Sequence, residues 1–437
     1  MRRAACAVAT ALALTYPAVP AAAEVPPLPP PVRVEPPAGR PPGPAPGLHA
    51  PERCTPLPRD DGPADDEAVD DETGSRLRLS DVHRLATGRG VLIAVIDTGV
   101  FPHRLLGDRL RGGGDYLTGG DGLDDCDGHG TAVAGLLAAA AGPGPGGRSD
   151  APIGIAPGAR LLAIRQSSPS FEVPGPDGTS HPAGDTETLA EAVVRAVREG
   201  ADVINISEAV CLAAGQAAVA GAGLHAALRF AADADVVVVV AAGNVGSGSC
   251  TEPGSGQVSL PGWYDDELLA VGAVGPDDAP APFTVPGPWV DVAAPGTGLR
   301  SLAVGGGTTT TGVDGTSFAA PWVAGLAALV RERFPELSAK QVADRILVTA
   351  RRPARGRDDR LGHGVIDPVA ALTAVPAVLE PTARPVSGVA VAELAGTTPR
   401  PAAAPSSSQI DFVAAGLLLV TGAVAAALLR RRSRLPR

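Results

Sequence analysis

Apolar residues in the middle of the chain fall into short, nearly continuous runs, which predict strands covered on both faces. The runs are residues 91–96, 161–164, 203–206, 236–241 and 268–274. Such unbroken runs are typical of parallel strands that lie between two layers of helices. Residues 131–141, 188–199, 222–232, 317–333 and 338–350 have helical patterns and fall between or after these runs. The alternation predicts a three-layer α/β domain with a mainly parallel sheet.

Composition separates this domain, which we place at residues 76–374, from the segments beside it. Residues 24–75 contain a proline-rich run and then, at 60–72, eight carboxylates without a base. This extension cannot bury enough apolar surface to fold alone, so it is either disordered or laid along the domain. Residues 375–409 are rich in Pro, Ala, Thr and Ser and predict a linker. Inside the domain, the Gly- and Pro-rich stretches 142–152 and 167–186 predict surface insertions.

Both ends of the chain contain apolar segments of the kind that direct a protein to a membrane. Residues 1–23 start with two arginines after Met1, continue as an apolar stretch and close with three alanines, as a cleavable secretory signal does. Residues 412–429 carry no charge and are followed by four arginines, which predicts a transmembrane helix at 410–430 and a basic cytoplasmic tail at 431–437. The domain would then lie outside the cytoplasm on a single-pass membrane anchor.

Charge and cysteine content narrow the possible functions. The 437 residues include 36 Lys and Arg against 47 Asp and Glu, for a net charge of -11. This argues against a nucleic-acid partner, which requires a basic surface. Once the signal is removed, Cys54, Cys126, Cys211 and Cys250 remain. An even number in an oxidising compartment predicts two disulfides, with three pairings open. We expect no metal and no cofactor.

The candidate chemistry lies at strand ends and helix starts. Asp97 follows the run 91–96, where a carboxylate can hold an imidazole. His129 lies in the sequence Asp-Gly-His-Gly-Thr, whose glycines permit close approach of other groups. Ser317 lies in Gly-Thr-Ser at a helix start, where its own backbone N–H and the helix dipole can stabilise an oxyanion. Asn244 ends the strand in Ala-Ala-Gly-Asn, where its amide can donate a second hydrogen bond. A turn acid, a loop histidine, a serine cap and a turn asparagine are the structural alternatives.

Taken together, these motifs resemble those of the subtilisin-like (peptidase S8) serine proteases, in which the order along the chain is Asp, His, Ser. The resemblance covers residues 76–374. It implies that Asp97 orients His129, that His129 acts as general base and then general acid, and that Ser317 attacks the scissile carbonyl. Asn244 and the Ser317 N–H would bind the oxyanion.

The resemblance also implies that Ser207, Glu208, Ala241 and Gly243 contact the substrate, with residues 203–209 and 241–243 acting as edge strands beside it. One departure concerns this region. Familiar subtilisins have glycine shortly after the serine equivalent to Ser207, whereas this chain has Glu208 and Ala209. The change implies steric or charge restriction of the first specificity pocket.

Residues 24–75 do not resemble the compact prodomain of secreted subtilisins, and the whole arrangement is similar to that of the mycosins, the membrane-anchored proteases of type VII secretion systems. Two functions follow from this resemblance. The first is an endopeptidase of narrow specificity that processes secreted proteins at the cell surface. The second is a mainly structural part of the secretion membrane complex, with hydrolysis secondary.

The expected strand ends also favour one disulfide pairing. Cys211 follows the strand that ends near Ser207, and Cys250 follows the strand that ends near Asn244. Neighbouring strands place these loops on one edge of the sheet, so we expect Cys211 to pair with Cys250, and Cys54 with Cys126. The second bridge would tie the N-terminal extension across the domain close to His129, as a strap and not as an inhibitory prodomain.

Overall fold

The structure is a computed structural model that describes residues 26–59, 72–140, 154–175, 178–251, 256–310 and 312–375. The expected signal at 1–23, the transmembrane helix at 410–430 and the tail at 431–437 lie outside these residues, as do most of the linker and the insertion at 142–152. No helix within the described ranges is both long and apolar enough to cross a bilayer.

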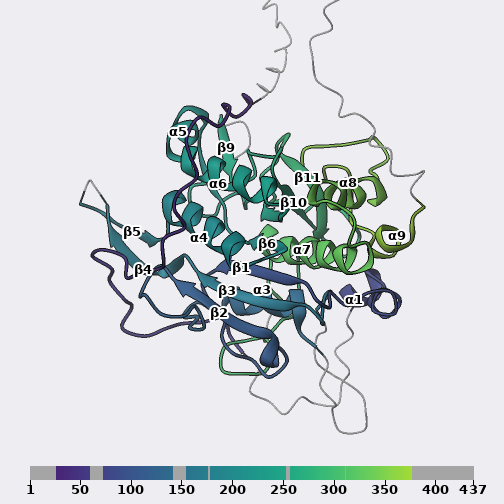
Figure 1. Ribbon diagram of the computed structural model, residues 1–437, viewed down its shortest axis with the longest axis horizontal. Coiled ribbons are helices and arrows are strands. Elements are labelled where there is room, and N and C mark those ends of the chain that lie inside the picture. Colours follow the sequence, from purple (N-terminus) through teal and green to yellow (C-terminus); the bar gives the residue numbers. More distant parts are fainter. Residues whose placement is uncertain are drawn as a thin grey trace, which may run out of the picture. The chain divides into compact units, whose positions relative to one another are not determined.

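Helices and strands alternate through the domain (Figure 1). The helices are α1 Glu72–Arg76, α2 Leu79–Val82, α3 His129–Ala138, α4 Thr186–Arg198, α5 Ala214–Ala220, α6 Ala222–Asp233, α7 Thr316–Arg333, α8 Ala339–Thr349 and α9 Pro368–Thr373. The strands are β1 Leu92–Asp97, β2 Leu110–Asp115, β3 Arg160–Arg165, β4 Ser168–Pro174, β5 Ser180–Ala183, β6 Val203–Ile206, β7 Val210–Ala213, β8 Val237–Ala241, β9 Gln257–Leu260, β10 Leu269–Val274 and β11 Val290–Pro295.

Seven of these strands form a parallel sheet in the order β11-β10-β8-β6-β1-β3-β2. Successive residues of a strand face opposite sides. In β1, Ile93 and Val95 therefore join the core that contains α3 and α7, whereas Ala94 and Ile96 join the core that contains α4 and α6. Both faces are apolar because both are covered, and the predicted three-layer α/β architecture is confirmed.

The structure adds strands that the apolar runs did not reveal. The outer strands β2 and β11 have the sequences Leu-Arg-Gly-Gly-Gly-Asp and Val-Asp-Val-Ala-Ala-Pro, in which glycine or aspartate interrupts the pattern. A side chain on Gly113 would lie 2.7 Å from Leu162 of β3, so the glycines let β2 approach its neighbour closely. The stretch 167–186, which we predicted as a surface insertion, contains an antiparallel hairpin of β4 and β5 that its Gly- and Pro-rich sequence did not indicate.

Residues 26–59 of the N-terminal extension lie along the domain, which is the second of the two alternatives. The Trp263 indole N–H donates to Pro27 O at 2.8 Å, Ala45 N to Leu117 O at 2.9 Å, and Thr310 N to Pro58 O at 3.0 Å. Cys54 is bonded to Cys126 across a Cα–Cα distance of 4.9 Å. Proline-rich backbone has few hydrogen-bond donors of its own and little entropy to lose, which suits an extended path over a folded surface.

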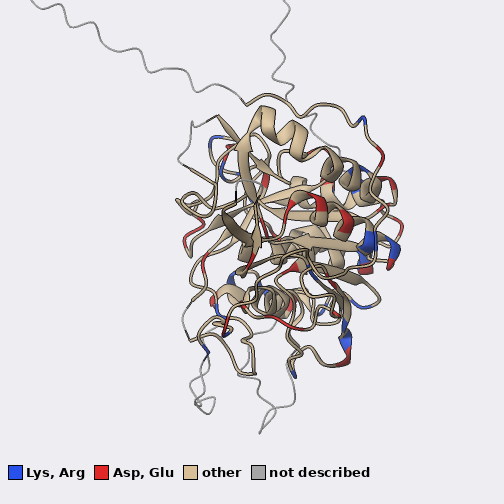
Figure 2. Cartoon of the chain, turned by 90° about the vertical axis from the view of Figure 1, so that its left-hand side faces the viewer, with Lys and Arg blue, Asp and Glu red and all other residues tan. Residues whose placement is uncertain are grey.

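The order of the strands also determines where the candidate site residues lie. Strands β8, β6 and β1 are neighbours in the middle of the sheet, and their carboxyl ends meet at one edge. The expectation that residues 203–209 act as an edge strand was therefore wrong for β6 itself, which pairs on both sides. Only residues 207–209, beyond the last pairing, are available to face a ligand. Figure 2 shows that the charged groups of both signs lie interspersed on the helices and loops around this sheet.

Candidate active site

An aspartate and a histidine meet at the end of β1. Asp97 is the last residue of β1 and is fully buried, while His129 is the first residue of α3. His129 Nδ1 lies 2.7 Å from Asp97 Oδ1, and the Thr98 N–H donates to the same oxygen at 2.8 Å. Because Nδ1 is occupied, Nε2 on the opposite side of the ring is the nitrogen left for a ligand. Phe318 packs on the imidazole at 4.9 Å between ring centroids.

The glycines around His129 are required by close contacts. A Cβ on Gly130 would lie 2.0 Å from Gly99 O and 3.0 Å from Asp97 Oδ1, so only glycine lets α3 start against the end of β1. Gly128 caps the helix with φ 78°, a left-handed conformation that favours glycine. The sequence argument for close approach at this motif is confirmed.

A second carboxylate, Asp125, holds the loop that presents His129. Its Oδ1 accepts from Thr98 Oγ1 and Gly128 N, both at 2.8 Å, and its Oδ2 accepts from Thr131 N and Thr131 Oγ1 at 2.8 and 2.6 Å. Burial raises the pKa of Asp125 to about 6, although the Thr131 and Thr98 donors act in the opposite direction. The sequence did not reveal this role, because Cys126 and Asp127 separate Asp125 from the Gly-His-Gly motif.

Ser317 stands at the start of α7, opposite Asn244. Thr316 N–H and Thr316 Oγ1 donate to Asn244 Oδ1 at 2.9 and 3.0 Å. Since a backbone N–H can only donate, the amide oxygen must face Thr316, which leaves the NH₂ group of Asn244 on the other side. A Cβ on Gly315 would lie 2.8 Å from Ser317 Oγ and 3.3 Å from Asn244 Nδ2. The absence of a side chain at Gly315 therefore keeps open the space between the hydroxyl and the amide donor.

These groups line one cleft of about 340 Å³. Seven of the eight predicted site residues border it, namely His129, Ser207, Glu208, Ala241, Gly243, Asn244 and Ser317. Asp97 is the eighth and lies behind His129. Thr316 also borders the cleft, and its hydroxyl accepts from Gly243 N at 3.1 Å, so it links β8 to α7. The threonine stands in the Gly-Thr-Ser motif, but only the fold assigns it this contact.

The electrostatics of the pair at the end of β1 favour a charged imidazole. Burial lowers the pKa of His129, but the charge of Asp97 and the hydrogen bond to it raise the pKa more, so the net shift is upward. The side chain of His129 is 26% exposed and that of Asp97 is 0% exposed. A buried negative charge beside a partly exposed imidazole stabilises the protonated ring whenever it takes up a proton.

The second disulfide braces the cleft. Cys211 of β7 is bonded to Cys250, which borders the cleft, with a Cα–Cα distance of 4.8 Å. The bond joins the segment after β6 to the segment after β8. Both disulfides therefore have the pairing expected from the strand ends.

Comparison with known proteins places this site in a family. The model for the subtilase family (peptidase S8) matches residues 88–364. Mycosin-4 of Mycobacterium tuberculosis is 45% identical over 68% of this chain and 67% of its own length, and Mycosin-3 of the same organism is 39% identical over 80% and 82%.

Solved structures give the same result. The MycP3 protease from the type VII (ESX-3) secretion system matches with a TM-score of 0.69 and 40% identity, over 79% of this chain and all of that chain. A chain in the structure of an intact ESX-5 inner membrane complex matches with a TM-score of 0.71 and 37% identity, over 92% of this chain and 99% of that chain. Since both the fold and the identity extend over most of each chain, the protein belongs to the subtilase family, in its mycosin subgroup associated with type VII secretion.

Proposed function

We propose that the protein is a serine endopeptidase in which Ser317 is the nucleophile and His129 the base. One observation carries the proposal. A histidine fixed at 2.7 Å from a buried carboxylate shares a cleft with a serine at a helix start and with an asparagine whose amide NH₂ group is left free by Thr316. This is the set of groups that acyl transfer requires.

The reaction follows from the positions of these groups. His129 Nε2 takes the proton of Ser317 as Oγ bonds to the scissile carbonyl carbon, and Asp97 stabilises the imidazolium that forms. The carbonyl oxygen becomes an anion, which Asn244 Nδ2 and the Ser317 N–H stabilise at the amino end of α7. When the C–N bond breaks, His129 gives its proton to the leaving amine. Water then hydrolyses the ester by the same steps in reverse order.

Substrate binding is proposed for the segments on both sides of the cleft. Residues 207–209 extend beyond β6, and residues 241–243 extend from the end of β8. Backbone groups of residues 207–209 beyond the last pairing of β6 can hold an extended peptide by strand-like hydrogen bonds, whereas Ala242 and Gly243 already use their N–H and C=O groups within the protein and contribute surface. On this proposal Ser207, Glu208, Ala241 and Gly243 contact the substrate, and the reaction uses no metal or cofactor.

The test is covalent labelling of the purified ectodomain with a fluorophosphonate probe, followed by peptide mapping. We expect labelling at Ser317, its loss in Ser317→Ala, and loss of peptide hydrolysis with it. Matched Ser301→Ala serves as the control, because Ser301 is buried and donates to Ala132 O outside the cleft. Labelling that persists in Ser317→Ala would exclude Ser317 as the nucleophile.

We further propose that the domain works outside the cytoplasm, anchored by residues 410–430 and assembled with a type VII secretion membrane complex. The charge-free run 412–429, the arginines after it and the two disulfides support this placement. Added protease should remove the domain from wall-stripped cells and leave a tag after Arg437 intact. Digestion of the tag would refute this orientation.

A mainly structural role is the second candidate, favoured by the match to a chain within the ESX-5 inner membrane complex. Cells that carry Ser317→Ala discriminate between the two roles. Unchanged secretion and a normal complex in those cells would assign the main role to assembly, whereas unprocessed secreted proteins would assign it to hydrolysis.

A further inference from the structure

We propose that Glu208 gives this protein a preference for substrates with an arginine or lysine side chain in a pocket beside the catalytic cleft. The inference rests on the proposed peptidase function and specifies its substrate class. We call this the side pocket; it has a volume of about 360 Å³ and fourteen lining residues.

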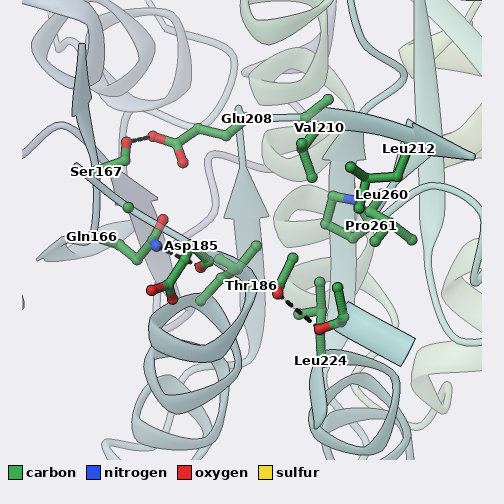
Figure 3. A pocket seen from close by; sticks show the side chains of 14 residues that line it. Gln166, Ser167, Asp185, Thr186, Glu208, Val210, Leu212, Leu224, Leu260 and Pro261 are labelled. Carbon is green, nitrogen blue, oxygen red and sulfur yellow. Dashed lines mark hydrogen bonds between the residues drawn. The ribbon is translucent and has the colours of Figure 1, made fainter. Parts of the chain in front are cut away.

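The side pocket adjoins the cleft that contains His129 and Ser317. Three residues line both hollows, namely Ser167, Glu208 and Ala209. Ser167 Oγ donates a hydrogen bond to Glu208 Oε1 (Figure 3), so this contact lies where the two hollows share lining residues. A peptide bound along residues 207–209 would therefore pass the mouth of the side pocket and can place one side chain in it.

The two sides of the pocket differ in polarity. In Figure 3, Gln166, Ser167, Asp185 and Glu208 lie on one side, and Val210, Leu212, Leu260 and Pro261 lie on the other. A side chain that fits between them needs an apolar stem and a polar end. Arginine and lysine have this form, since their methylene stems pack on apolar surface while the head group remains among polar atoms.

The acidic lining of the side pocket favours a positively charged substrate side chain. Among the fourteen lining residues two are acidic, Asp185 and Glu208, and none is basic. Asp185 is already used as the cap of α4, where its carboxylate accepts from Thr188 N at 2.7 Å and offsets the positive end of the helix. Within the described part of the chain, Glu208 forms no ion pair with an arginine or lysine, and its one side-chain hydrogen bond is the bond that Oε1 accepts from Ser167.

The raised pKa of Glu208 is consistent with a carboxylate that lacks a positively charged partner. Burial raises the pKa of its carboxyl group, and Asp97 raises it further, whereas His129 lowers it. The site thus destabilises the charged carboxylate when it is empty. A guanidinium or ammonium group in the side pocket would supply the counter-charge and a charge-assisted hydrogen bond, which an uncharged side chain of the same shape cannot do.

The experiment compares pairs of fluorogenic peptides that differ only in arginine against citrulline, its neutral isostere, placed in turn at each position before the scissile bond. We expect kcat/KM to favour arginine by about tenfold or more at one position, the size of a charge-assisted hydrogen bond. In Glu208→Gln this ratio should fall to about one, because the amide keeps the size of the side chain and removes its charge. Asp185→Asn removes the other carboxylate of the pocket while asparagine still caps α4, so it shows which carboxylate sets the ratio, and we expect the larger loss in Glu208→Gln. Glu336→Gln is the matched control, because it removes the same charge from an exposed glutamate that lines neither hollow, and the ratio should persist.

A second measurement does not depend on turnover. Fluorescence anisotropy of the same peptides on Ser317→Ala should show tighter binding of the arginine peptide, and on the Ser317→Ala, Glu208→Gln double variant equal binding. Equal affinities and equal kcat/KM values for both peptides on the parent site would overturn the inference, as would loss of the preference in Asp185→Asn alone. If no peptide is cleaved and the fluorophosphonate does not label Ser317, the proposed peptidase function fails, while the binding comparison still decides the role of Glu208.

Discussion

Replacing Cys54 and Cys126 together by alanine tests whether the N-terminal extension is a stabilising strap. The bridge closes a sequence separation of 72 residues, for which the loop-entropy relation gives about 4.4 kcal/mol at 25 °C. The hydrogen bonds of the extension to Trp263, Leu117 and Thr310 remain in the variant, so the extension should stay in place. We expect the free energy of unfolding to fall by about 4 kcal/mol and the melting temperature by roughly 6 °C.

Activity should change much less than stability. The loop with His129 is also held by the five hydrogen bonds of Asp125, none of which involves Cys126. Removing the bridge therefore leaves the contact between His129 and Asp97 intact. Peptide hydrolysis below the melting temperature is expected to stay within severalfold of the parent protein.

The assay is urea unfolding of the ectodomain followed by fluorescence of the buried Trp263, Trp289 and Trp322. The double variant of Cys211 and Cys250 is the matched control, since its separation of 39 residues gives about 3.9 kcal/mol by the same relation. A loss well below about 1 kcal/mol would refute the strap as a source of stability. Deletion of residues 24–71 completes the test: a folded product that is tens of times more active would show that the extension is an inhibitor.

Three further variants test the site. Asp97→Asn should lower kcat by about 10⁴-fold. Because the Asp97 carboxylate raises the pKa of His129 and hydrolysis needs the neutral imidazole, the acid limb of the pH profile of kcat/KM should also move to lower pH. An acid limb that stays in place would contradict this effect of Asp97. Asn244→Ala should lower kcat by about 10²–10³-fold, as for the matching asparagine in subtilisin, with KM little changed; a rise in KM alone would exclude oxyanion stabilisation. Gly130→Ala should lower the free energy of unfolding by about 1–3 kcal/mol and remove most activity, because its Cβ would lie 2.0 Å from Gly99 O. Gly215→Ala is the control, since no atom lies near its Cβ, and it should be neutral or stabilising. Urea unfolding of both variants measures the difference.

The sequence determined the architecture of the domain and the identity of its reactive groups. A parallel sheet covered on both faces requires continuous apolar runs, so five of the seven strands of the main sheet could be placed from the sequence. The outer strands β2 and β11 could not, because each pairs with only one other strand of the sheet and glycine or aspartate interrupts its apolar pattern. Asp97, His129, Asn244 and Ser317 were recognised because each stands in a short motif next to a strand end or a helix start.

Only the tertiary structure decided how these groups are oriented and what surrounds them. Asn244 turns its NH₂ group to the cleft because Thr316, 72 residues later, donates to its oxygen. Asp125 acquired a role, and β4 and β5 became a hairpin, through contacts that no local pattern records. Ser167 meets Glu208 across 41 residues, and both residues line the side pocket and the cleft. Motifs depend on neighbours in the chain, whereas pocket walls, hydrogen-bond direction and unpaired charge depend on neighbours in space.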